Sequence, residues 1–245
     1  RYRIDNSKRT HHTALIDCDL LAKVYINLID QKEPTLNLNQ EDLINENLDE
    51  TIELRHWFHQ NAELSNREFK TAARIAEELK KIGYEPMTGI AKTGVVAILS
   101  PGKPGPVVGL RADIDALPVK ERADIPWASK MKGVYNGEEV PVMHACGHDM
   151  HTAILLAAAK ILYDIKDEIP GQVKFIFQPA EEGAPPGEEG GAELMVKEGV
   201  LKNPDVDAIF GLHVWSGLYA GQVYLRPEGI CLLYTSPSPR DPIGS

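Results

Sequence analysis

Helical and strand-like patterns alternate along residues 41–230, and this alternation constrains the fold more than any other feature of the chain. Apolar residues recur three and four positions apart in the helical segments, whereas short apolar runs bounded by proline or glycine mark the strands. The expected helices cover residues 41–58, 67–81, 151–165 and 192–197, and the expected strands cover 94–99, 107–110, 172–177, 208–213 and 222–225. Such an alternation predicts an α/β fold with helices on both faces of one sheet.

The segment 67–81 has a helical apolar face and is followed by Gly83, a typical helix stop. Six residues share the spacing of that face: Phe69, Ala72, Ala73, Ile75, Ala76 and Leu79. We therefore expect these six side chains to face the core.

Charge, hydropathy and cysteine content exclude several classes of protein. The net charge of −10 argues against a general nucleic-acid binder, and we expect no nucleic-acid partner. No run of about 18 apolar residues is present, so no membrane span is predicted. The three cysteines Cys18, Cys146 and Cys231 are far apart and odd in number, which favours a reducing compartment over a disulfide framework. These properties together favour a cytoplasmic enzyme.

Chemically reactive side chains follow the expected strands. Asp113 and Asp115 follow the strand at 107–110, Glu181 and Glu182 follow the strand at 172–177, and His213 ends the strand at 208–213. Cys146 and His148 immediately precede the helix expected at 151–165. Sites in open α/β sheets collect beyond the carboxyl ends of strands, so these seven residues are expected to form one site.

The residue types in this set indicate a transition-metal site. An extended backbone would place Cys146 and His148 on one side, and a thiolate beside an imidazole favours a transition metal over magnesium or calcium. Glu182 and His213 can add two further ligands, which leaves Glu181 free to take a proton from bound water and return it to a leaving amine. We interpret His151 as a group that supports the ligands.

Each residue has a plainer interpretation when it is taken alone. A single cysteine is more often a small buried hydrophobe, adjacent glutamates are more often a solvated pair, and a histidine on an apolar strand is more often a hydrogen-bonded core residue. Only their joint placement at strand ends favours the metal site. We interpret His56, His59 and His144 as structural.

Four motifs in the same region resemble one family, the metal-dependent amidohydrolases of the zinc-peptidase superfamily. They are Gly-Leu-Arg-Ala-Asp-Ile-Asp-Ala-Leu-Pro at 109–118, Met-His-Ala-Cys-Gly-His-Asp-Met-His-Thr at 143–152, Phe-Gln-Pro-Ala-Glu-Glu-Gly at 177–183 and Phe-Gly-Leu-His-Val-Trp at 210–215. That family includes hippurate hydrolases, N-acyl-amino-acid amidohydrolases and auxin-conjugate hydrolases. Residues 54–65 resemble its usual opening, with Asn61 in place of a proline.

The resemblance implies a three-layer αβα catalytic domain that hydrolyses the amide bond of small N-acyl amino acids or peptides. It assigns two divalent ions, manganese or zinc with cobalt as an alternative. The implied ligands are Cys146, His148, Glu182 and His213, and Glu181 is the implied general base. The resemblance also implies support from Asp115, and we expect the same of Asp113 and His151. Homodimers formed through a separate lid domain are common in that family.

The chain departs from the family pattern after Leu225. A lid and dimerisation domain should follow, then the rest of the catalytic domain with a last metal-binding histidine, but no histidine occurs after His213. We therefore expect an incomplete catalytic domain that is inactive or very weakly active.

Residues 1–38 carry a separate resemblance, to the end of the exonuclease domain of the proofreading subunit of bacterial DNA polymerase III. Apolar spacing between Leu15 and Leu28 predicts a helical extension. In that family His12 and Asp17 would match a general base and a metal ligand, but the other acidic ligands are missing, so we expect no nuclease activity. Two alternatives to an amidohydrolase remain. One is a fragment of a DNA-processing 3′–5′ exonuclease, based on His12 and Asp17, and the other is a non-catalytic metal-binding fragment.

Residues 231–241 resemble a translated sequencing adaptor, and we expect residues 231–245 to be a non-native tail. Cys231 would then have no functional role. The expected organisation is an exonuclease remnant at 1–38, part of an amidohydrolase catalytic domain at 41–230, and that tail.

Overall fold

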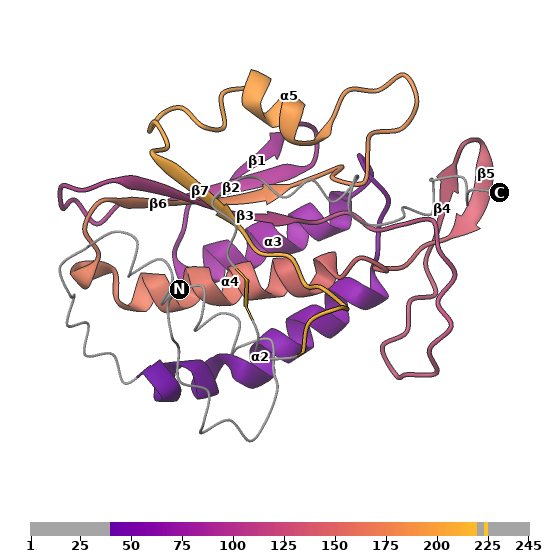
Figure 1. Ribbon diagram of the computed structural model, residues 1–245, viewed down its shortest axis with the longest axis horizontal. Helices are drawn as coiled ribbons and strands as arrows, with labels where there is room; N and C mark the ends of the chain where they lie inside the picture. The colour runs from indigo at the N-terminus through magenta and orange to yellow at the C-terminus, as the bar shows by residue number, and fades with distance from the viewer. Residues whose placement is uncertain (1–39, 220–222, 225–245) are drawn as a thin grey trace.

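A five-stranded mixed sheet forms the middle layer of the computed structural model, which describes residues 40–219, 223 and 224 (Figure 1). The strands are β1 (Met87–Ile90), β2 (Gly94–Leu99), β3 (Val107–Asp113), β6 (Gln172–Gln178) and β7 (Ala208–Gly211). A two-stranded hairpin consists of β4 (Lys132–Tyr135) and β5 (Glu138–Pro141). The helices are α2 (Gln40–Gln60), α3 (Phe69–Ile82), α4 (His148–Asp164) and α5 (Gly191–Lys197), with a short 3₁₀ turn at Lys166–Glu168.

The strand order β1-β2-β6-β3-β7 places three parallel strands side by side. β3 pairs in parallel with β6 on one side and with β7 on the other, whereas β2 pairs antiparallel with β6 and β1 antiparallel with β2. The carboxyl ends of β3, β6 and β7 therefore lie at the same edge of the sheet, where the chemically reactive residues follow them.

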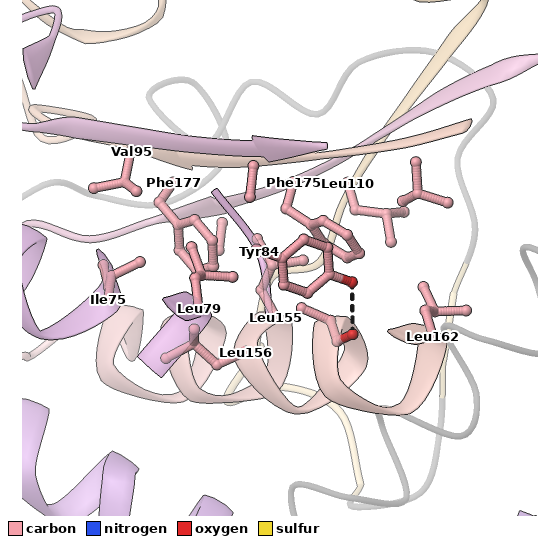
Figure 2. Close-up of a cluster of buried hydrophobic side chains, with 14 of the residues drawn as sticks. Ile75, Leu79, Tyr84, Val95, Leu110, Leu155, Leu156, Leu162, Phe175 and Phe177 are labelled. Carbon is pink, nitrogen blue, oxygen red and sulfur yellow. Dashed lines mark hydrogen bonds between the residues drawn. The ribbon is translucent and has the colours of Figure 1, made fainter. Parts of the chain in front are cut away.

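The main core lies between the sheet and helices α3 and α4 (Figure 2). Alternate residues of β6 supply Phe175 and Phe177 to this face, as the two-residue period of a strand requires. Leu79 of α3 and Leu156 of α4 pack against them. Tyr84 is buried here, and its hydroxyl group donates a hydrogen bond to the carbonyl oxygen of Ala159 at 2.8 Å. The buried hydroxyl therefore has a hydrogen-bond partner.

Helix α5 covers the opposite face of the sheet, while α2 lies against α4 on the outer side (Figure 1). Ile176 of β6 and Val96 of β2 pack there against Met195 of α5. The layers therefore confirm the α/β fold with helices on both faces of the sheet.

The β4–β5 hairpin is an element that the periodicity analysis missed. Its turn residues Asn136 and Gly137 both have positive φ angles, 52° and 84°. A two-residue turn of this kind needs left-handed backbone at both positions, which asparagine and glycine accept most readily. The Asn-Gly pair was therefore a usable signal in the sequence.

Several boundaries differ from those expected. β3 continues through Asp113, so this residue ends the strand instead of following it, and α4 already begins at His148. β7 ends at Gly211, two residues before His213. Of the strand expected at 222–225, only Val223 and Tyr224 are described, and neither lies in a strand.

The expected apolar face of α3 is partly wrong. Phe69 is 62% exposed and Ala73 is also exposed, whereas Thr71 and Glu78 are buried. The buried face is centred on the sides of Ile75 and Leu79. At about 100° per residue, Phe69 lies roughly 100° from the middle of that face, at its margin.

Candidate metal centre

Donor side chains meet at the carboxyl-terminal edge of the three parallel strands. The described residues form three groups of donors, and His148 belongs to all three. Within each group the donor atoms lie within 4.8 Å of one another. The groups are Cys146–His148–His213, Asp113–His148–His151 and His148–Glu181–Glu182. The structure thus brings all the expected ligands of the described region, and the expected base, around one imidazole.

His148 is fully buried at the first position of α4. Its Nδ1 lies 2.9 Å from the carbonyl oxygen of Asp115 and 3.2 Å from the Oδ1 of that residue, so Nδ1–H is the donor. The other ring nitrogen, Nε2, is buried and has no hydrogen-bond partner among the described residues. A buried nitrogen without a partner costs free energy, and a metal ion at Nε2 would remove that cost.

Gly147 makes the turn that joins Cys146 to His148. Its φ of +87° is left-handed, and a Cβ there would lie 2.4 Å from the side chain of Val214. The backbone between the two donors is therefore a bend and not the extended segment that we expected from their spacing. Their donor atoms still lie within 4.8 Å of each other.

Cys146 and His213 form the second part of the centre. The Sγ of Cys146 lies 3.4 Å from Nε2 of His213, whose Nδ1–H donates to the carbonyl of Val214 at 2.6 Å. Burial raises the pKa of the Cys146 thiol and lowers the pKa of His213 to about 4. His213 is thus held neutral with Nε2 toward the thiol, which is the form that binds a metal.

Glu181 and Glu182 approach the same ring from the loop after β6. The distances from Nε2 of His148 to Oε2 of Glu181 and to Oε1 of Glu182 are 3.8 Å and 3.9 Å. Burial raises the pKa of Glu181 to about 7, and the nearby Asp113 and Asp115 carboxylates act in the same direction. These distances leave room for an ion between the donors, so the residues present fit a divalent metal.

Asp113 and His151 support the backbone and side chains that carry the donors. Asp113 is fully buried, and its carboxylate contacts Nδ1 of His151 and the guanidinium of Arg111. Nε2 of His151 accepts a hydrogen bond from the backbone N–H of Val214 at 2.9 Å. Both nitrogens of His151 are therefore occupied, and the ring holds the segment that carries His213.

Burial and charge shift the titration of His148 and Asp113 in opposite directions. Burial disfavours the charged forms of both groups. The attraction between them, with that of Asp115 and His151, outweighs burial, raising the pKa of His148 well above its ordinary value and lowering that of Asp113. The carboxylates around the ring of His148 therefore favour a positive charge at this position.

Comparison with known proteins identifies the family. The model of peptidase family M20/M25/M40 matches residues 109–230, which contain every donor described above. These residues belong to peptidase family M20/M25/M40. The five-stranded sheet with its flanking helices is the corresponding part of an M20 catalytic domain, as the solved structures show.

The chain is similar to M20 proteins over about three quarters of its length. It is 43% identical to the N-acyl-L-amino acid amidohydrolase of Geobacillus stearothermophilus, over 74% of this chain and 45% of that protein. It is also 43% identical to the hippurate hydrolase of Campylobacter jejuni, over 70% and 42%. The YXEP protein of Bacillus subtilis, described as a dinuclear metal-binding peptidase from the M20 family, superposes with a TM-score of 0.59 at 40% identity, over 67% and 42%. The chain thus spans less than half the length of these relatives.

The three histidines that we interpreted as structural differ in their contacts. Nδ1 of His59 lies 3.0 Å from Asp149, and Nε2 lies 2.7 Å from Glu121. His56 stacks on Trp127, with ring centroids 3.7 Å apart. His144 is buried, and neither of its ring nitrogens has a partner among the described residues. None of the three belongs to a donor group around His148 within the described region.

Sequence reasoning missed two residues before α3 that contact neighbours of the candidate donors. The hydroxyl of Ser65 donates to Oδ2 of Asp115 at 2.7 Å. The carboxylate of Glu68 accepts the backbone N–H of Ala180 at 2.8 Å, directly before Glu181. Ser65 lies in the opening motif, which offered a signal, whereas Glu68 had no local signal that could identify its contact.

The remaining sequence expectations concern residues outside the described region. His12 and Asp17 of the suggested exonuclease remnant lie there, as do Cys18, Cys231 and the tail at 231–245. Within residues 40–219, no helix combines the length and the apolar character that crossing a membrane requires.

Proposed function

We propose that this chain carries the metal-binding half of an enzyme that hydrolyses the amide bond of N-acyl amino acids. The observation that carries the proposal is the buried, unpartnered Nε2 of His148 at the point where donors from three parallel strands converge. The names of the similar M20 proteins, an N-acyl-L-amino acid amidohydrolase and a hippurate hydrolase, support this substrate class.

In this proposal Cys146, His148, Glu182 and His213 would hold two divalent ions, with manganese, zinc or cobalt as candidates. Bound ions would activate water and polarise the scissile carbonyl. Glu181 takes a proton from the attacking water and returns it to the leaving amine. Its pKa of about 7 suits both transfers at neutral pH, because such a carboxylate accepts and releases protons readily.

The surrounding residues keep these groups in place. Asp115 accepts from Nδ1–H of His148 and from the backbone N–H of Glu182 at 3.0 Å, so one carboxylate orients two ligands. His151 holds Asp113 and the backbone next to His213.

We further propose that the full-length protein is cytoplasmic and dimeric.

Cobalt titration tests the metal site. In a background where Cys18 and Cys231 are changed to serine, Co²⁺ should produce the intense near-ultraviolet absorption of a thiolate–cobalt bond. Cys146→Ser should abolish that band, and His148→Ala should weaken binding by at least about tenfold. A His56→Ala control should bind normally, because His56 lies outside the donor groups. Equal binding in all four proteins would refute the site.

The activity itself is tested in a chimera. Residues 41–219 would replace the matching part of the Geobacillus stearothermophilus enzyme, and hydrolysis of N-acetyl and N-benzoyl amino acids would be measured with Mn²⁺ or Zn²⁺. Glu181→Gln should lower kcat by about 10²- to 10⁴-fold while metal binding persists. A folded chimera that binds metal through Cys146 but hydrolyses none of these substrates would indicate a non-catalytic metal-binding module instead.

A further inference from the structure

Glu68 is a completely buried carboxylate that the proposed reaction does not use. It immediately precedes α3, yet its side chain makes no capping hydrogen bond to that helix. Instead, Oε1 accepts the backbone N–H of Ala180 at 2.8 Å, and Oε2 accepts the hydroxyl of Thr93 at 2.7 Å. Burial raises the pKa of Glu68 to about 7.

Ala180 is the point where the chain turns from β6 toward Glu181. Its φ of +48° lies in the left-handed region, which residues with a side chain rarely adopt. Such a conformation persists only where surrounding contacts impose it. The bond from Ala180 N–H to Glu68 is a contact of this kind, and it reaches the backbone of the turn itself.

Hydrogen bonds hold the backbone at residues 180–182 in two places. Asp115 accepts the N–H of Glu182 at 3.0 Å, and Glu68 accepts the N–H of Ala180 at 2.8 Å. Glu181 lies between these anchors, and its Oε2 is 3.8 Å from Nε2 of His148. Any change in the backbone at residue 180 would therefore move both glutamates relative to the imidazole.

We infer that Glu68 is a positioning residue that fixes the Ala180 turn and thereby aims Glu181 and Glu182 at the metal centre. This inference rests on the proposed function for the roles of the two glutamates. It assigns a role at the site to the residue that precedes α3, because the reach of the Glu68 side chain fixes the distance from that residue to the Ala180 backbone.

Two conservative substitutions separate geometry from charge. Glu68→Gln keeps the length of the side chain, and its amide can still accept from Ala180 and donate to the oxygen of Thr93. Glu68→Asp keeps the charge but is one methylene too short to reach both partners. A positioning role predicts that Gln retains the metal affinity within a few-fold and that Asp lowers it by about 10- to 100-fold.

The chain provides a control on helix α3 at Glu78. Its carboxylate is buried and accepts from Arg74 and Lys81, and it belongs to no donor group around His148 in the described region. Glu78→Asp should therefore shorten a buried carboxylate of α3 without changing Co²⁺ affinity. Near-ultraviolet circular dichroism would confirm that all three variants are folded.

Amide hydrogen exchange without added metal gives an independent readout. Glu68→Asp should accelerate exchange at Ala180 and Glu182 while the amides of β6 keep their protection, and Glu68→Gln should not. Unchanged exchange and unchanged Co²⁺ affinity in Glu68→Asp would overturn the inference, as would the reverse ranking of Asp and Gln. If the wild-type chain showed no Cys146-dependent Co²⁺ binding, the proposed function would fail, and exchange alone would decide the role of Glu68.

Discussion

His148 shows how one buried ring organises its neighbours. Asp115 fixes Nδ1, so Nε2 must point toward Glu181, Glu182 and Asp113. Nε2 makes no hydrogen bond to any of the described residues, so it is available to a metal ion. The same carboxylates stabilise a positive charge at Nε2, which a proton supplies without metal and which a bound metal ion would supply instead.

Metal binding should release protons from this residue and from Cys146. The pKa values of both groups are raised, so both carry protons near neutral pH, and both must lose them to become ligands. We therefore expect the apparent metal affinity to increase as the pH rises. Calorimetry in buffers of different ionisation enthalpy would count the protons, and Cys146→Ser should lower the count by about one. An unchanged count in Cys146→Ser would show that the thiol is not a ligand.

The candidate donors and three of the residues that support them, Asp113, Asp115 and His151, were predictable from sequence, whereas two further supports were not. Glu181, Glu182 and His213 stand directly beyond strands, so strand prediction alone brought them together. Ser65 and Glu68 act through contacts with residues 50 and 112 positions away in the chain, and such contacts leave no local pattern. The bend at Gly147 was also missed, although a glycine readily adopts the left-handed φ found there.

Helix α3 illustrates how periodicity identifies an element without fixing its orientation. The apolar spacing correctly predicts a helix, but two of the six expected core residues are exposed. Packing against both the sheet and α4 turns the helix so that Ile75 and Leu79 point inward, and both are 0% exposed. Rotation about the helix axis is decided by those neighbours, which a single segment does not encode.

Two alanine substitutions on α3 should therefore have very different effects. Leu79→Ala should lower the free energy of unfolding by about 2–5 kcal/mol, because it opens a cavity in the main core. Phe69→Ala should change it by less than about 0.5 kcal/mol, because that ring is mostly in solvent. Urea denaturation followed by circular dichroism measures both, and a large loss in Phe69→Ala would contradict the orientation described.

The whole sheet is asymmetric at its two edges. The outermost strands β1 and β7 both have four residues and one partner strand among the described residues, but β1 is antiparallel to β2 whereas β7 is parallel to β3. Ile209 in β7 is 50% exposed. A strand edge that carries an exposed apolar residue favours pairing with another chain.

We expect this edge to cause self-association that depends on protein concentration. Ile209→Lys should reduce it, because a charge on an edge strand opposes pairing. Val196→Lys removes a similarly exposed apolar residue, 53% exposed, but from α5, and it should have little effect. Sedimentation velocity over a range of concentrations would compare the proteins, and equal association in all of them would exclude β7 as the contact.

The parallel pairing of β3 with β6 also has a kinetic consequence. The ladder joins Val107 to Gln172, with the β4–β5 hairpin and α4 in the intervening loop. Closing so long a loop costs chain entropy before the contacts compensate for it, so folds of high contact order form slowly. The donors gather only after this closure. A metal ion would therefore slow unfolding and leave the rate of folding almost unchanged.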